Sequence, residues 1–226
     1  MCLLAGTASL CLAQIEVGSG APNEATRQGF ISAYFRGAFP SLVRLPPAGN
    51  VTSFGGTGFR QEFNEAVGSG KLALIRNTAG APPVVDGDVV SDVFQVHAAV
   101  YAYYSSVGVT TAGFPVMDTQ NCPPVSGNTC TYQLFSLNYA LFSYLLPNEF
   151  GQNFFIRDST SGNFYTKWIS SGGVSGLGPA TSGEQTNAAS VTGSRANFQT
   201  YSQGAIFNIT SGALTGRLVS VRNPIF

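Results

Sequence analysis

Apolar residues at helical spacing predict the strongest helix of the chain, from Asp88 to about Ser105. Their spacing follows a period near 3.6 residues, as on one face of an amphipathic helix. The stripe consists of Val93, Val96, Val100, Tyr104 and Val107. Asp88 or Ser91 is expected to cap its start, because a short polar side chain there accepts a hydrogen bond from the first turn.

Similar patterns predict two shorter helices. One covers Asn163–Ile169, where Phe164 and Trp168 lie four residues apart, and the other covers Glu24–Phe35, with Gly29 in its middle. Glycine takes the left-handed conformation that ends many helices. The glycines expected to end the three helices are Gly108, Gly172-Gly173 and Gly37.

Two later segments have the composition of β-structure. Residues Tyr132–Leu146 are nearly all aromatic, aliphatic or β-branched, and Phe198–Ile209 alternates between apolar and polar residues. Thr210-Ser211-Gly212 separates Ile206 from Leu214 and predicts a hairpin turn. Each part of the chain is thus expected to run helix, turn, loop, strand, turn, strand.

A composite pattern recurs three times along the chain. It contains a turn rich in glycine and proline, a triplet Gln-x-aromatic that is expected to open a strand, and an arginine that follows. The turns are Gly37-Ala38-Phe39-Pro40, Ala112-Gly113-Phe114-Pro115 and Leu177-Gly178-Pro179; the triplets are Gln61-Glu62-Phe63, Gln133-Leu134-Phe135 and Gln199-Thr200-Tyr201; the arginines are Arg76, Arg157 and Arg222. One such unit cannot bury its apolar face alone, so the units are expected to stack. Their predicted bounds are 24–87, 88–160 and 161–226.

The third unit carries the most specific set of these residues. They are Trp168, Gly172-Gly173, Leu177-Gly178-Pro179, Thr181-Ser182-Gly183-Glu184, Phe198-Gln199-Thr200-Tyr201, Gly204-Ala205-Ile206 and Thr210-Ser211-Gly212-Ala213. With these residues the chain resembles the LGFP-repeat family. The second unit keeps its turn, Asp118 and Tyr132-Gln133-Leu134-Phe135, and the first keeps Phe39-Pro40 and its triplet. The resemblance is strongest over 163–226, weaker over 90–160 and weakest before residue 90.

The resemblance implies an α+β fold, in which a β-rich array of about three units surrounds a pseudo-symmetry axis as a propeller-like disc. It also implies a non-catalytic module on an exported bacterial protein, which binds cell-wall or other surface polysaccharide and anchors the attached protein. Further domains of the same protein would be additional partners. Two interpretations of the two ends of the chain stay open. In one, the first helix packs where a fourth helix would lie and closes the array; in the other, the chain is part of a longer protein.

The N-terminus predicts export. Residues 1–13 form an apolar run, shorter than the roughly 20 residues of a membrane-spanning helix, and Cys11-Leu12-Ala13 fits cleavage of a signal peptide before Gln14. The mature domain, 14–226, is expected to be extracellular or at the cell surface, with the periplasm as an alternative, and to lack a transmembrane segment. Eleven basic residues balance eleven acidic ones, which argues against nucleic acid as a partner.

Two cysteines remain after the predicted signal peptide. Cys122 and Cys130 flank a turn-forming segment and are expected to form a structural disulfide in an oxidising compartment. A zinc site would need more ligands, and His97 is the only histidine. No metal site is therefore predicted at this pair.

The sequence predicts neither catalysis nor a cofactor. A Ser-His-acid triad would need His97, which the pattern places inside a helix, and no Gly-x-Ser-x-Gly segment presents a serine. Gly68-Ser69-Gly70-Lys71 departs from a phosphate-binding loop, because Glu65 and Leu72 replace required residues. Calcium at Asp86, Asp88 and Asp92 is a minor alternative to helix capping.

Eight residues are candidates for ligand binding, because they recur between units or carry aromatic rings. They are Gln133, Gln199, Arg157, Arg222, Asp118, Glu184, Trp168 and Tyr201. Structural roles compete with binding: a buried amide can tie a strand to a turn, Trp168 can belong to the core, and the arginines can pair between units. The leading hypothesis is polysaccharide binding, the alternative is a structural or adhesion domain that contacts protein, and a secreted glycan or ester hydrolase is least supported.

Overall fold

A computed structural model describes residues 15–36, 45–64, 70–77, 84–85, 88–89, 92–125, 127–146, 149–160, 162–190 and 193–223. The predicted signal peptide, the predicted turn at 37–40 and Asp86 lie outside these residues. The fold is α+β: short helices accompany three larger antiparallel sheets and a two-stranded one.

The first sheet has the strand order β1-β2-β3-β6, the second β11-β10-β9-β8-β7 and the third β12-β13-β14-β15. The first contains β1 (Thr52–Phe54), β2 (Gly58–Asn64), β3 (Lys71–Asn77) and β6 (Val93–Val96). The second contains β7 (Gln120–Val125), β8 (Asn128–Phe135), β9 (Tyr139–Leu146), β10 (Glu149–Ser159) and β11 (Gly162–Asn163). The third contains β12 (Gln185–Ala189), β13 (Arg195–Tyr201), β14 (Gly204–Ile209) and β15 (Leu218–Arg222), and β4 (Val84–Val85) pairs with β5 (Asp88–Val89).

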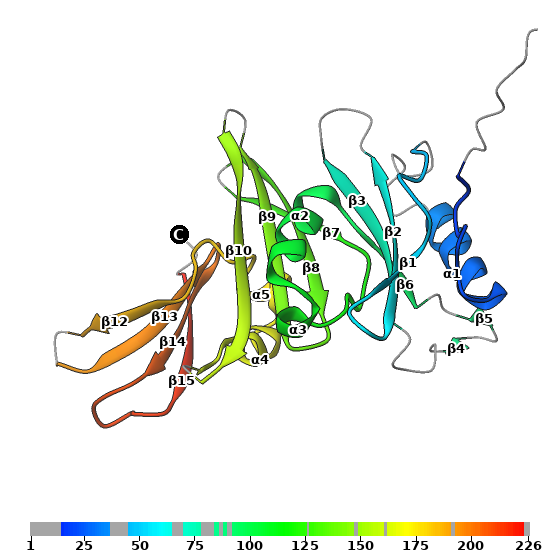
Figure 1. The fold of residues 1–226 in the computed structure, drawn as a ribbon. Coiled ribbons are helices and arrows are strands. Elements are labelled where there is room, and N and C mark those ends of the chain that lie inside the picture. Colours follow the sequence, from blue (N-terminus) through cyan, green and yellow to red (C-terminus); the bar gives the residue numbers. More distant parts are fainter. Residues whose placement is uncertain are drawn as a thin grey trace, which may run out of the picture.

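The helices are α1 (Glu24–Phe35), α2 (Ala98–Val107), α3 (Val109–Ala112), α4 (Phe164–Ser170) and α5 (Gly173–Gly176). Figure 1 shows the three sheets one after another, with α1 at one end of the molecule and β12–β15 at the other. Helix α2 lies between the first and second sheets, and α4 lies between the second and third (Figure 1).

Hydrophobic clusters explain why α2 and α4 lie between sheets. Val100, Tyr101 and Tyr104 of α2 share one cluster with β3 on one side and with β8 and β9 on the other. Phe164 and Trp168 of α4 share a second cluster with the second and third sheets. Each of these helices therefore buries two sides between sheets, whereas the cluster of α1 contains residues of one sheet, the first.

The sequence predicted α1 and α4 well. The bounds of α1 agree with the expectation, and the side chain of Asn23 caps its start by accepting a hydrogen bond from the N–H of Thr26. Helix α4 begins one residue later than expected. The local signals were sufficient here, because Phe164 and Trp168 both fall on the buried side of one short helix.

The expected helix from Asp88 was wrong in its first half. Asp88 lies in β5 and Val93–Val96 forms β6, so α2 begins only at Ala98, with His97 at its N-cap position. Val93 and Val96 fit a helical stripe, but they pair with β3 and are fully buried in the sheet. Tertiary pairing overrides local periodicity in such short segments. The first sheet thus extends beyond residue 87, where the first unit was expected to end.

The triplets were assigned to the wrong end of their strands. Each Gln-x-aromatic triplet lies at or near the end of a strand, in β2, β8 and β13. The apolar segment 132–146 is a hairpin of β8 and β9 that turns at Asn138, which has a positive φ of 52°. In addition, Arg76 lies on β3, which pairs directly with the triplet strand β2, whereas Arg157 and Arg222 lie on β10 and β15, one strand further from their triplets.

The predicted disulfide is present between Cys122 and Cys130. The two residues lie opposite each other on β7 and β8, and their Cα atoms are 5.1 Å apart. No described helix has the length and apolarity needed to cross a membrane. The described strands form no closed sheet, and the disc around a pseudo-symmetry axis stays a prediction.

Candidate functional site

A buried glutamine stands at the same place in all three sheets. Gln61, Gln133 and Gln199 are at most 1% exposed, and each is the first residue of its triplet. Their amide nitrogens donate to the carbonyls of Gly49, Met117 and Ser182, respectively. Each glutamine therefore ties its strand to the loop that leads into the previous strand.

An aromatic side chain on each of the helices α1, α2 and α4 makes a second recurring contact. The hydroxyl of Tyr34 donates to the carbonyl of Leu45, at 3.2 Å, and the hydroxyl of Tyr104 donates to the carbonyl of Gly113, at 2.7 Å. The indole N–H of Trp168 donates to the carbonyl of Gly178, at 2.9 Å. Two residues after each of these carbonyls the chain pairs with the last residue of the triplet, as Pro47 with Phe63, Pro115 with Phe135 and Ala180 with Tyr201.

These contacts place residues 45–47 where the other two regions have their glycine- and proline-containing turns. The sequence offered no signal for this, because Leu45-Pro46-Pro47 lacks the glycine of the turns at Gly113 and Gly178. The helix tyrosine and the isolated bridge identify the correspondence in space.

The same glutamines also make hydrogen bonds that reach a neighbouring sheet or the N-terminal segment. Gln199 donates to the carbonyl of Phe155 on β10, at 2.6 Å. Gln133 accepts from the hydroxyl of Thr119, whose N–H donates to the carbonyl of Gln95 on β6. Gln61 donates to the carbonyl of Glu16, at 3.1 Å. For Gln133 and Gln199 this contact leads to a strand of the preceding sheet, β6 or β10. For Gln61, the N-terminal segment provides the contact instead.

Four of the eight predicted ligand-binding residues are buried. Gln133, Gln199, Trp168 and Tyr201 are at most 3% exposed, and each makes a hydrogen bond within the protein. Burial raises the pKa of the Tyr201 hydroxyl far above its ordinary value, with Glu184 adding to the shift. The contacts of these four residues are architectural, because a ligand would have to open the core to reach them.

Asp118 and Glu184, the two acidic candidates, are half-buried. Asp118 forms an ion pair with Arg36, at 2.6 Å, and accepts a hydrogen bond from the N–H of Gln95. It therefore links α1, β6 and the loop that leads into β7.

Arg157 and Arg222 are exposed. The guanidinium of Arg157 lies 5.5 Å from the ring centre of Phe155, and that of Arg222 donates to the carbonyl of Ser171. The two arginines occupy matching places, opposite Tyr139 and Gly204 at the starts of β9 and β14. Of the eight candidates, these two remain the most accessible to a ligand.

A polar cluster that the sequence did not reveal joins α2 to the first sheet. The hydroxyl of Tyr101 donates to Glu62, at 2.6 Å, and accepts from Arg60, while Lys71 binds the other carboxylate oxygen. Burial alone would raise the pKa of the Glu62 carboxyl, but the hydrogen bonds from Tyr101 and Lys71 and the nearby charges outweigh it and lower the pKa. Burial and the Glu62 bond raise the pKa of Tyr101 to about 12.

The described residues bring no three His, Cys, Asp or Glu side chains together as a metal site. Of the two described acids in the minor calcium hypothesis, Asp92 forms an ion pair with Arg76, at 2.8 Å. This pair gives Asp92 a structural role beside α1.

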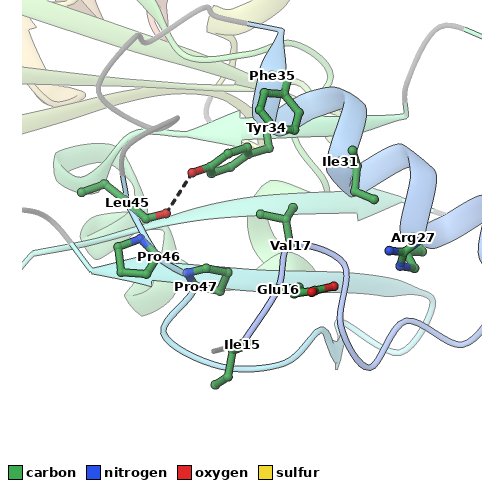
Figure 2. A pocket seen from close by; sticks show the side chains of 10 residues that line it. All are labelled: Ile15, Glu16, Val17, Arg27, Ile31, Tyr34, Phe35, Leu45, Pro46 and Pro47. Atoms are coloured by element: carbon green, nitrogen blue, oxygen red, sulfur yellow. Dashed lines mark hydrogen bonds between the residues drawn. The ribbon is translucent and has the colours of Figure 1, made fainter. Parts of the chain in front are cut away.

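A pocket of about 610 Å³ opens beside α1, between the helix and the N-terminal segment. Figure 2 shows Ile31, Tyr34 and Phe35 on the helix side, with Leu45, Pro46 and Pro47 on the opposite wall. Ile15, Glu16, Val17 and Arg27 complete the lining. We call this site the α1 pocket. Eight of its ten lining residues have aliphatic or aromatic side chains, and Phe35 is 65% exposed.

The third sheet carries an apolar surface at the other end of the molecule. Phe198, Phe207 and Val219 lie side by side across β13, β14 and β15, as do Thr200, Ala205 and Val221. We call these six residues the outer face. The rings of Phe198 and Phe207 stack at 5.8 Å, and Val219 and Val221 are 37% and 51% exposed.

Comparisons with known proteins do not assign the chain to a family. The chain matches no protein-family model, no curated protein and no solved structure.

Proposed function

We propose that the protein is a non-catalytic assembly module that binds other proteins through the α1 pocket and the outer face. The observation that carries this proposal is the incomplete packing at both ends. Helices α2 and α4 each bury two sides between sheets, whereas α1 buries one side and the outer face has no helix from the described residues in its cluster.

We infer further that the three helix-and-sheet regions are copies of one unit. The recurring glutamine, helix aromatic and β-bridge support this, because three independent contacts fall at matching positions. A stack of such units repeats its interfaces, and its end units expose the surfaces that inner units bury. This is the property expected of a module that assembles end to end with protein partners.

The disulfide between Cys122 and Cys130 supports an exported location, since such bonds persist in oxidising compartments. Exposed apolar surface at both ends supports a protein partner, because patches of this kind mark interaction sites.

Photo-crosslinking in the cells that make the protein tests this function. A benzophenone amino acid replaces Phe35 in one variant and Val221 in another, and the matched control carries it at Leu137, an apolar turn residue that is 54% exposed. We expect adducts with protein at both ends and only background at Leu137. Absence of protein adducts from both ends would contradict the proposal.

Surface polysaccharide, the ligand implied by the resemblance, is a second candidate. Exposed Arg157 beside the ring of Phe155 favours it, because a guanidinium fork and an aromatic face suit sugar hydroxyls and carbon atoms. Co-sedimentation with insoluble wall polysaccharide tests this candidate. An Arg157→Ala variant that pellets as well as the wild type would remove Arg157 from the site.

A further inference from the structure

We propose that the partner is a second copy of this chain, bound head to tail, with α1 of one copy on the outer face of the next. This inference rests on the proposed function and names its partner. The two surfaces lie at opposite ends of the molecule in Figure 1, so one chain cannot bring them together without rearrangement.

The second sheet shows how a helix covers such a face. There the matching rows are Tyr132, Phe142 and Phe154, and Leu134, Ala140 and Ile156. Phe142, Ala140 and Ile156 are fully buried in the cluster that contains Trp168 of α4. In the first sheet, Ile75, Ala73 and Val96 occupy the same rows and are fully buried with α2. At these places the third sheet has Phe207 and Ala205, which are half-buried, and Val219 and Val221, which are 37% and 51% exposed.

The first helix carries the complementary surface. Tyr34 makes the contact that Tyr104 makes in α2, so Ile31 holds the place of Tyr101, three residues earlier. Tyr101 is the α2 residue that reaches the outer rows of the preceding sheet, where it binds Arg60 and Glu62. Ile31 instead lines the α1 pocket, next to exposed Phe35 (Figure 2). An apolar residue at this place suits an apolar sheet.

The two surfaces also fit in size. A hollow of about 180 Å³ lies beside Phe207, between Ala188, Ala196 and Ile209. A cavity of about 150 Å³ is enough for a benzene ring, so this hollow can receive the ring of Phe35.

The N-terminal segment defines the kind of contact. Because the carbonyl of Glu16 already binds Gln61, a docked sheet gains no hydrogen bond to that glutamine. Docking therefore depends on side chains that enter the α1 pocket and cover Phe35. A head-to-tail contact joins two different surfaces, so it yields closed rings or open chains of copies.

Two variants test the geometry of the contact. Phe35→Glu blocks the α1 side and Val221→Glu blocks the sheet side, and both residues are more than half exposed, so the fold tolerates the charge. The matched control is Leu137→Glu, at an equally exposed leucine away from both surfaces. Circular dichroism confirms that each variant keeps its fold.

Sedimentation velocity at rising concentration is the measurement. We expect wild type and Leu137→Glu to form species larger than the monomer, and each end variant alone to associate on the order of a hundredfold more weakly, because it buries an unpaired charge. An equimolar mixture of the two end variants should form a dimer that does not grow, since one intact copy of each surface remains.

Three results would overturn the inference: wild type that stays monomeric, a mixture that forms no dimer, or an end variant that dimerises alone through a two-fold contact. The proposed function and this inference can be distinguished, because each can fail without the other. Protein adducts at Phe35 and Val221 in cells, together with a monomeric purified protein, would retain the function and assign it to a different partner.

Discussion

Replacement of Gln199 by leucine tests the buried contacts that join the second and third sheets. The amide nitrogen of Gln199 donates to the carbonyls of Phe155 and Ser182, at 2.6 and 2.9 Å, and its oxygen accepts from the hydroxyl of Tyr201, at 3.1 Å. Leucine has a similar size but can make none of these hydrogen bonds.

The magnitude follows from the number of bonds lost. Each buried hydrogen bond contributes about 1 kcal/mol net, and a buried group left without a partner costs about 1–3 kcal/mol. The Tyr201 hydroxyl would be such a group, because Tyr201 is 3% exposed. We expect Gln199→Leu to lower the free energy of unfolding by about 3–5 kcal/mol. In a protein of this size each 1 kcal/mol shifts the Tm by about 2–4 °C.

Denaturant titration followed by circular dichroism measures the change. Gln203→Leu is the control, because it makes the same substitution at an exposed residue that follows Tyr201 in the next turn, and exposed sites usually change stability by less than about 0.5 kcal/mol. Tyr201→Phe removes one of the three bonds, so its effect and that of Gln199→Leu should add incompletely in the double variant. A Gln199→Leu protein as stable as the control would refute the structural role of the buried amide.

Three further predictions concern stability. Burial raises the pKa of five tyrosines most strongly, so the unfolded chain loses their protons above about pH 10 while the folded chain keeps them. They are Tyr101, Tyr104, Tyr139, Tyr144 and Tyr201. Stability should fall above pH 10 by about 1.4 kcal/mol per pH unit for each one. Tyrosinate absorbance that rises to the full value for all nine tyrosines without loss of circular dichroism would contradict this. Because the pKa of Glu62 is lowered, its contribution to the free energy of unfolding is present above its ordinary pKa of 4.5 and is lost as the pH falls through the folded value. Glu62→Gln should cost about 1 kcal/mol at neutral pH and flatten the acid side of the plot of stability against pH. An unchanged plot would count against the polar cluster. Replacement of Cys122 and Cys130 by alanine should cost about 2.5 kcal/mol more under oxidising conditions than under reducing ones, where only the packing of the buried thiols is lost. A loss that is equal in both would show that the bond does not form.

Local signals in the sequence were sufficient to predict elements whose structure depends on residues close together in the chain. Asn23 caps α1, and Phe164 and Trp168 place the buried side of α4, so the bounds of both helices could be predicted. The two cysteines could be paired because they flank a short turn. The recurring glutamines identified matching positions in three sheets, and the expectation that a buried amide ties a strand to a turn describes Gln133 and Gln199.

Contacts distant in sequence could not be predicted in this way. Strand β6 satisfied a helical period, and only its pairing with β3 makes it a strand. Asp118 recurred with Glu184 as a candidate site, but its role depends on Arg36, which lies 82 residues earlier in the chain. The α1 pocket combines residues 15–17 with α1 and with 45–47, and the outer face depends on the register of three strands. Neither surface has a local pattern of its own.

The exchange of side-chain amide protons, observed by nuclear magnetic resonance, tests the central claim that matching buried glutamines hold the three sheets in one stack. We expect the amide protons of Gln61, Gln133 and Gln199 to exchange with solvent far more slowly than those of exposed Gln120 and Gln203. Exchange of the three at the rate of the exposed pair would contradict the claim.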